Sequence, residues 1–186
     1  MAHPQPKPAS YQDIIDLPEN VVGEIIDGEL YVQPRPAPRH AQASSMLGGK
    51  LMDPYHGGIG GPGGWWILDE PELHFGFQVL VPDLAGWRRE RMPKLPDAAW
   101  FELAPDWACE VLSPSTVRKD RVKKMRIYAQ QGVTYLWLMD PIARTLEAYR
   151  NADGQWLLLQ TLENDDRVSV APFDAITFDL AALWAD

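Results

Sequence analysis

The chain has 186 residues, of which 46% are hydrophobic and 23% are charged, the normal balance of a globular protein with its own core. Its formal net charge of −9 argues against a protein that wraps nucleic acid mainly by phosphate attraction, because such binding relies on clustered lysine and arginine. No apolar run is long enough to span a membrane, and Cys109 is the only cysteine, which excludes a disulfide framework and a cysteine-ligated zinc site. We therefore expect no membrane partner and a cytoplasmic location.

The N-terminal part predicts a lead-in, a short helix and a hairpin. Residues 1–10 are rich in proline and lack the basic-then-apolar pattern of a signal peptide, so they are expected to be extended or disordered. Residues 11–186 are expected to form a single domain. Tyr11–Leu17 can form a short helix, and Gly23–Val32 has the pattern of two strands joined by an Asp27-Gly28 turn.

A proline-rich loop and a second helix follow the hairpin. Three prolines predict that Gln33–Arg39 is a loop, since proline cannot continue a strand ladder. His40–Tyr55 has an apolar side with helical spacing, although two internal glycines weaken the helix. His56–Gly64 contains six glycines in nine residues but fits no phosphate-binding pattern, and we expect a surface loop there.

Strand patterns continue up to a second acidic position. Successive strands are predicted at Trp65–Leu68, Leu73–Phe77 and Gln78–Val81, and Asp83 closes the last of them. Glu70, before these last two strands, is either a cleft residue or an exposed loop acid. Trp87–Pro105 is polar and contains prolines, which predicts a long loop that could carry recognition residues such as Trp87.

The stretch around Glu110 predicts a central strand. Alternation places Cys109, Val111 and Ser113 on one face and Glu110 with Leu112 on the other. An ionised carboxylate on the apolar side of Leu112 is costly unless a cation or hydrogen-bond donors surround it. Glu110 is therefore either a structural acid with an internal partner or a functional one.

The remaining pattern completes a mixed fold. Ser115 or Thr116 can begin a helix that runs to about Gln131, where Gly132 ends it. Further strands are predicted at Val133–Met139, Thr145–Tyr149 and Trp156–Thr161, the last two joined by an Asp153-Gly154 turn. The order of elements predicts an α/β or α+β protein.

Asp83 and Glu110 form the first candidate site. They lie 27 residues apart at or near the ends of neighbouring predicted strands. Two such carboxylates can bind Mg²⁺ (or Mn²⁺), which takes oxygen ligands and keeps several waters. With a basic side chain nearby, this set could hydrolyse a phosphodiester, because the metal activates water and the cation stabilises developing charge.

Two lysines compete for the basic position. At about 100° per residue, Lys124 borders the apolar face formed by Val122, Tyr128 and their neighbours, whereas Lys123 points away from it. Asp120, Lys124 and Tyr128 also form a row with spacing of four, so Lys124 could instead pair with Asp120. We expect Lys124 to be the functional lysine.

The same helix carries a basic strip, defined as the six of the seventeen cations that occur within nine residues: Arg118, Lys119, Arg121, Lys123, Lys124 and Arg126. It is either a local contact for nucleic acid or a solvated helix face.

Several short patterns in their order along the chain resemble the Uma2 family of restriction endonuclease-like proteins, formerly a domain of unknown function. They are Glu24-x-x-Asp27-Gly28-Glu29-Leu30, His40, Val81-Pro82-Asp83, Glu110-Val111-Leu112-Ser113-Pro114-Ser115-Thr116, Asp120-x-x-x-Lys124-x-x-x-Tyr128, and Gly132-Val133-x-x-x-Trp137-x-x-Asp140-Pro141. The resemblance covers almost the whole chain. It implies the PD-(D/E)XK nuclease fold, a mixed β-sheet flanked by helices with extra β-hairpins.

The resemblance also implies roles for individual residues. Asp83 and Glu110 would bind the metal, and Glu24 would be a helper acid. The usual lysine two residues after the second acid is replaced by Leu112, and the family's lysine falls on Lys124 in the following helix. His40 also matches a family position and is a candidate for a supporting hydrogen bond.

Two hypotheses follow. The first is a Mg²⁺-dependent endonuclease that hydrolyses nucleic acid, DNA rather than RNA, and forms a homodimer. The second is a catalytically degenerate nuclease-fold module for binding or assembly, which the net charge and the missing strand lysine favour. A glycoside hydrolase with an acid pair is a third, weaker alternative.

Overall fold

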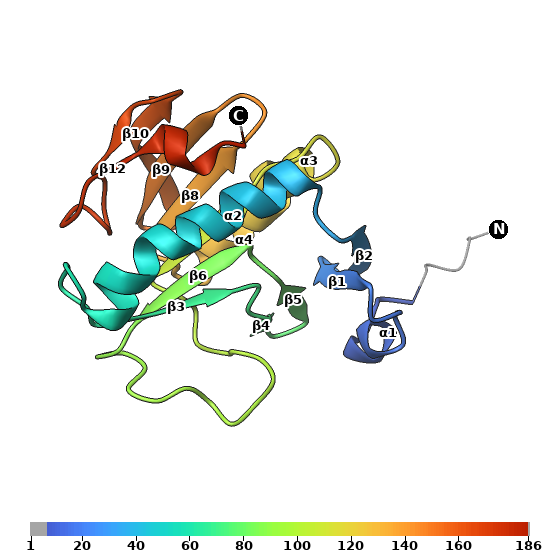
Figure 1. Ribbon diagram of the computed structural model, residues 1–186. Helices are drawn as coiled ribbons and strands as arrows, with labels where there is room; N and C mark the ends of the chain where they lie inside the picture. The colour runs from blue at the N-terminus through green and yellow to red at the C-terminus, as the bar shows by residue number, and fades with distance from the viewer. Residues whose placement is uncertain (1–6, 186) are drawn as a thin grey trace.

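The computed structural model describes residues 7–185 (Figure 1), so most of the predicted lead-in over residues 1–10 lies outside the described residues. The strands have these bounds: β1 (Val21–Ile26), β2 (Glu29–Pro34), β3 (Trp65–Asp69), β4 (Leu73–Phe75), β5 (Gln78–Leu80), β6 (Leu84–Arg88), β7 (Trp107–Val111), β8 (Tyr135–Asp140), β9 (Thr145–Ala152), β10 (Gln155–Glu163), β11 (Arg167–Val168) and β12 (Phe178–Asp179).

The helical segments include two π-helical turns. Their bounds are α1 (Tyr11–Ile15), α2 (Pro38–Leu51), the π turn η1 (Met52–Gly57), α3 (Val117–Lys119), the π turn η2 (Asp120–Lys124), α4 (Met125–Gln130) and the 3₁₀ turn η3 (Leu180–Leu183). Among the described residues, no helix combines the length and the apolar character needed to cross a membrane.

The main sheet is mixed, as the sequence predicted. It has six strands in the order β10-β9-β8-β7-β6-β3, and β7 pairs with β8 in parallel while the other pairs are antiparallel. The helical segment from α3 to α4 connects these two parallel strands, since a parallel pair needs a long crossover. A second, antiparallel sheet has the order β2-β1-β5-β4. The predicted α+β class with a mixed sheet is thereby confirmed.

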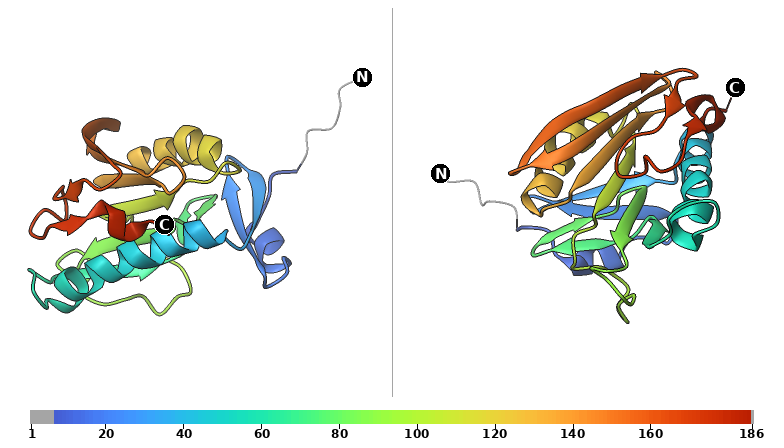
Figure 2. Two further views of the ribbon diagram at one scale, coloured as in Figure 1. Left: turned by 45° about the horizontal axis from the view of Figure 1, so that its top comes forward. Right: turned by 90° about the vertical axis from the view of Figure 1, so that its left-hand side faces the viewer.

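A hydrophobic core lies on each face of the main sheet. Figure 2 (right) shows α2 on one side of this sheet and the segment from α3 to α4 on the other. Cys109 and Val111 pack in the core of α2, while Ala108 and Leu112 pack in the core of α4. The predicted alternation along β7 is correct, and Glu110 shares the α4 face.

Strand β6 was missed by the sequence analysis. Asp83 does not close the preceding strand but stands immediately before β6, and Trp87 is a fully buried strand residue rather than part of a loop. Because β6 is buried on both faces, its sequence shows no polar alternation. Gly86 fits here because a Cβ would lie 3.1 Å from the Ile67 side chain.

Two boundaries near α2 also differ from the prediction. The Gln33–Arg39 segment is not all loop, because Pro34 ends β2 as an edge-strand partner of Val21 and Pro38 opens α2. Proline suits the first turn of a helix, where its missing N–H is not needed. The internal glycines do not break α2, and Gly48 faces the Leu84 side chain at the start of β6, where a Cβ would lie 3.4 Å away.

Candidate functional site

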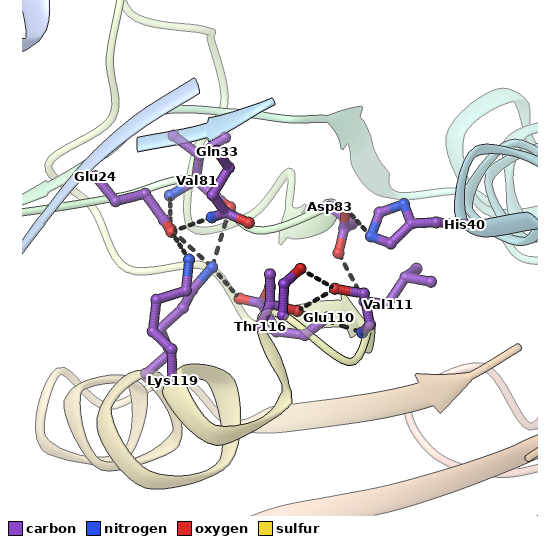
Figure 3. Close-up of polar contacts among 12 residues, drawn as sticks. Glu24, Gln33, His40, Val81, Asp83, Glu110, Val111, Thr116 and Lys119 are labelled. Carbon is purple, nitrogen blue, oxygen red and sulfur yellow. Dashed lines mark hydrogen bonds and ion pairs between the residues drawn. The ribbon is translucent and has the colours of Figure 1, made fainter. Parts of the chain in front are cut away.

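A cleft of about 850 Å³ lies between the β1–β2 hairpin, the loop before β6 and the start of the α3–α4 segment. Its walls include six of the predicted site residues: His40, Asp83, Glu110, Asp120, Lys123 and Lys124. His40 belongs to α2, Asp83 to the loop before β6 and Glu110 to β7, and the other three belong to η2. Segments far apart in the sequence therefore meet at one place (Figure 3).

Glu110 and Lys124 form a buried ion pair at the base of the cleft. The Lys124 Nζ lies 2.7 Å from Glu110 Oε1 and 2.8 Å from Glu24 Oε1, and it also donates to the Val81 carbonyl at 3.1 Å. The Tyr128 hydroxyl donates to Glu110 Oε1 at 2.5 Å. The helix-borne lysine therefore reaches the strand acid, although the strand position that usually carries the lysine is the buried Leu112.

Burial sets the protonation of this pair. Removal from water, reinforced by Asp120 and Asp83, raises the pKa of Glu110 well above its ordinary value even though Lys124 opposes the shift. Burial alone would lower the pKa of Lys124, but Glu110 and Glu24 outweigh it and raise that pKa well above the usual range. Burial also raises the pKa of Tyr128, so its hydroxyl stays a proton donor.

Glu24 is fully buried and all its observed partners are donors. Its Oε1 accepts the N–H of Val81 at 2.9 Å beside Lys124, and its Oε2 accepts from Gln33 Nε2 at 2.9 Å and from Lys119. Figure 3 shows Glu24 and Lys119 pointing toward one another. Burial alone would raise the pKa of Glu24, but the two lysines lower it. Glu24 does not line the cleft, and its geometry suits holding Lys124 in place.

Asp83 stands at the cleft wall between a backbone amide and a histidine. Its Oδ2 accepts the N–H of Val111 at 2.6 Å, and His40 Nε2 lies 3.2 Å from its Oδ1 (Figure 3). Burial alone would lower the pKa of His40, but Asp83 raises it. Val111 follows Glu110 directly, so this amide fixes the two acids relative to each other along β6 and β7.

Asp120 and Lys123 line the cleft but make no contact with the buried pair that the structure records. Asp120 is 2% exposed, burial raises its pKa, and no ion pair with Lys124 forms within the described residues. Lys123 instead lies 3.0 Å from Glu29 and donates to the Tyr31 hydroxyl at 2.5 Å. Lys124 pairs with Glu24 and Glu110, and its charge also lowers the pKa of Asp120 against the effect of burial.

Sequence reasoning missed Lys119 and left Glu70 undecided. Lys119 pairs with Glu24, 95 positions away, and only its place in the basic strip could have drawn attention to it. Glu70 lines the cleft, and burial, together with Asp69 and Asp83, raises its pKa.

This donor set fits a divalent cation held by few protein ligands. Within residues 7–185, no three His, Cys, Asp or Glu side chains gather closely enough to enclose an ion. Asp83 and Glu110 are oxygen donors that both line the cleft, and Asp83 lies close enough to Glu110 to add to the rise that burial causes in the pKa of Glu110. Mg²⁺ suits such a site, because it commonly takes one or two carboxylates and keeps its waters.

The comparisons with known proteins agree with this architecture. A crystal structure described as "a putative nuclease belonging to DUF820 from Anabaena variabilis ATCC 29413" matches with a TM-score of 0.74 and 24% identity, over 96% of this chain and 98% of that chain. No curated protein matches the chain. The model of the Uma2 family, described as "Putative restriction endonuclease", matches residues 9–181, and the chain belongs to this family.

Proposed function

We propose that this protein is a metal-dependent endonuclease that hydrolyses phosphodiester bonds of DNA. The observation that carries the proposal is the meeting of Asp83, Glu110 and Lys124 at one cleft, with Lys124 Nζ 2.7 Å from Glu110. Two carboxylates and one amine are the groups that this hydrolysis requires. Membership of the family described as "Putative restriction endonuclease" supports the same class.

The roles of the residues follow from their surroundings. Asp83 and Glu110 would hold Mg²⁺ (or Mn²⁺), which when bound polarises the scissile phosphate and lowers the pKa of the attacking water. Lys124 keeps its proton because of Glu110 and Glu24, so it can stabilise negative charge that develops on the phosphate. Glu24 and Tyr128 position Lys124 and Glu110, and His40 positions Asp83.

The experiment compares isosteric variants in a plasmid-cleavage assay with Mg²⁺ or Mn²⁺. We expect Asp83→Asn and Glu110→Gln each to lower the rate by about 10²-fold or more, the scale seen when one transition-state-stabilising group is lost. Glu90→Gln is the matched control, because Glu90 is an exposed acid in the loop after β6 and does not line the cleft. Circular dichroism checks that each variant folds.

Calorimetry with Mn²⁺ separates this proposal from a catalytically degenerate module. A live site binds Mn²⁺ in the wild type and in Glu90→Gln but loses it in Asp83→Asn. The burial of Glu110, which is 3% exposed and tied to Lys124, is the observation that favours the degenerate alternative. Absence of both Mn²⁺ binding and cleavage in the wild type would select that alternative.

The proposal also covers the cellular location, the oligomeric state and the substrate of the protein. We propose a cytoplasmic enzyme, supported by the single cysteine, Cys109, which leaves no disulfide to form within the chain. We also propose a homodimer, supported by edge strand β10, whose exposed residues Leu157, Leu158 and Leu159 are apolar and uncharged. DNA is the proposed substrate, and cleavage of matched DNA and RNA oligonucleotides distinguishes the two.

A further inference from the structure

Five of the six side chains of the basic strip form ion pairs with acids of the same chain. Lys119 and Lys124 bind Glu24, Lys123 binds Glu29, Arg121 binds Glu147 with two hydrogen bonds of 2.8 and 3.1 Å, and Arg126 binds both oxygens of Asp27. Only Arg118 makes no ion pair or hydrogen bond with another described residue. It is exposed and lines the cleft.

A second arginine that lines the cleft likewise lacks an acidic partner among the described residues. Arg35 is exposed in the segment between β2 and α2, lines the same cleft, and forms no ion pair with the described residues. Its charge opposes the rise that burial, Asp69 and Asp83 cause in the pKa of Glu70, which places the Arg35 charge toward the acids of the cleft. Two cations from separate segments are therefore left for a bound anion.

Neutral donors lie beside Arg118 on the cleft wall. Ser113 Oγ contacts Ser115 Oγ and Thr116 Oγ1, each at 3.0 Å, and all three residues line the cleft. Serine and threonine hydroxyls, like arginine, are common partners of nucleic-acid phosphates. The wall that carries Arg118 can thus both neutralise and hydrogen-bond a phosphate.

The size and charge of the cleft limit what can enter. Its volume of about 850 Å³ is that of a small-ligand pocket, which admits a nucleotide or two rather than a duplex. Duplex DNA carries about one charge per 1.7 Å, and a protein of net charge −9 with two available cleft cations cannot match many of them.

We propose that Arg118 and Arg35 form a clamp for phosphates of a single nucleic-acid strand, next to the phosphate that is cleaved at Asp83 and Glu110. This inference rests on the proposed function and specifies its substrate as single-stranded DNA. Arg118 is exposed at the cleft, whereas Glu110 is almost completely buried, so the clamp holds a flanking phosphate and not the scissile one.

The test is the salt dependence of binding, measured with metal-free protein in EDTA so that no cleavage is needed. A fluorescein-labelled single-stranded oligodeoxythymidylate is titrated by anisotropy between 50 and 200 mM NaCl. Two phosphate contacts on a single strand predict a slope of about −1.4 in log K against log salt, or about a sevenfold loss of affinity over this range. An oligonucleotide duplex of equal length is expected to bind more weakly.

Substitutions of single residues show which side chains produce the salt dependence of binding. Arg118→Ala and Arg35→Ala are each expected to reduce the slope to about −0.7, a loss of about two- to threefold over the same range, and the double variant brings it near zero. Ser115→Ala is expected to weaken binding without changing the slope, because its hydroxyl carries no charge. Arg150→Ala is the matched control, since Arg150 is exposed in β9 and does not line the cleft.

The clamp is overturned if the wild type fails to bind, if neither arginine variant changes the slope, or if Arg150→Ala changes it equally. Tighter binding of the duplex with a steep slope also overturns it. These outcomes are separate from failure of the proposed function, which appears as absent cleavage and absent Mn²⁺ binding while the strand still binds.

Discussion

Glu24 and Glu110 are two glutamates that share one lysine but have opposite electrostatic surroundings. Glu24 has Lys119, the Gln33 amide and the Val81 N–H in addition to Lys124, and its pKa is lowered. Glu110 has Lys124 and a tyrosine hydroxyl, and burial, reinforced by further acids nearby, raises its pKa. The larger number of donors makes Glu24 a fixed support, whereas Glu110 has fewer donors and lines the cleft, where a metal ion could reach it.

Replacement of Glu24 is therefore a prediction about stability. Glu24→Gln leaves Lys119 and the buried Lys124 short of a counter-charge, and breaking a buried ion pair costs about 3–5 kcal/mol of the free energy of unfolding. Because the folded protein lowers the pKa of Glu24, the wild type's advantage is full above the unfolded pKa near 4.5 and shrinks as pH falls through the lower, folded value. Urea unfolding at pH 7 and at pH 4 measures both effects.

The control for this prediction is another glutamate paired with a lysine. Glu29 binds Lys123, but its side chain is 66% exposed and solvent screens the pair, so Glu29→Gln is expected to cost much less stability than Glu24→Gln. Equal losses in the two variants at pH 7 would contradict the claim that burial decides the difference.

At the scale of elements, the helix after β7 shows how far periodicity predicts a site. A face drawn at 100° per residue placed Lys124 at the border of the core, and it is buried, but the same face included Val122, which is 63% exposed. The π turn of η2 changes the angular step within that segment, so positions before and after it do not keep one α-helical face.

The parts of the site that the sequence could not supply depend on long-range pairing. Predicted strand ends and the helical face singled out Asp83, Glu110 and Lys124, the resemblance to a family pointed to the same residues, and alternation placed Glu110 on the face of Leu112. The contact of Lys119 with Glu24 spans 95 positions and has no local pattern. Strand β6 was not recognised in the sequence because it is buried on both faces, so it lacks the polar alternation by which strands are recognised.

Gly132, after α4, and Gly49, inside α2, give a prediction about how alanine changes stability. Gly132 has φ of +79° and Gly49 lies inside α2, yet a Cβ at either position would meet no atom within 4 Å. Gly132→Ala is expected to destabilise by about 1–2 kcal/mol, because the left-handed region penalises a Cβ. Gly49→Ala is expected to stabilise by about 0.5–1 kcal/mol. Thermal unfolding measures both, and shifts of the same sign would contradict the argument.

At the scale of the whole molecule, the negative charge and the internal use of the basic strip limit how copies can meet. Two chains of charge −9 repel, so a stable contact needs a surface with little charge. Strand β10 is the outer edge of the six-stranded sheet and carries no charged side chain before Glu163. Native edges are usually protected by lysine, proline, a β-bulge or a covering segment; β10 contains neither lysine nor proline, and its pairing with β9 shows a register shift between Leu158 and Gln160.

The outer part of β10 is apolar as well as uncharged, which makes it the predicted homodimer contact. Leu157, Leu158 and Leu159 are 48%, 50% and 36% exposed. Two antiparallel copies of this edge can pair about a two-fold axis, which gives the closed interface typical of dimers. We expect light scattering after gel filtration to give twice 21.0 kDa for the wild type and 21.0 kDa for Leu158→Lys. Phe77→Lys, at an exposed apolar position between β4 and β5, is expected to remain dimeric. A monomeric wild type, or a dimer that survives Leu158→Lys, would mean that β10 does not join two copies of the chain.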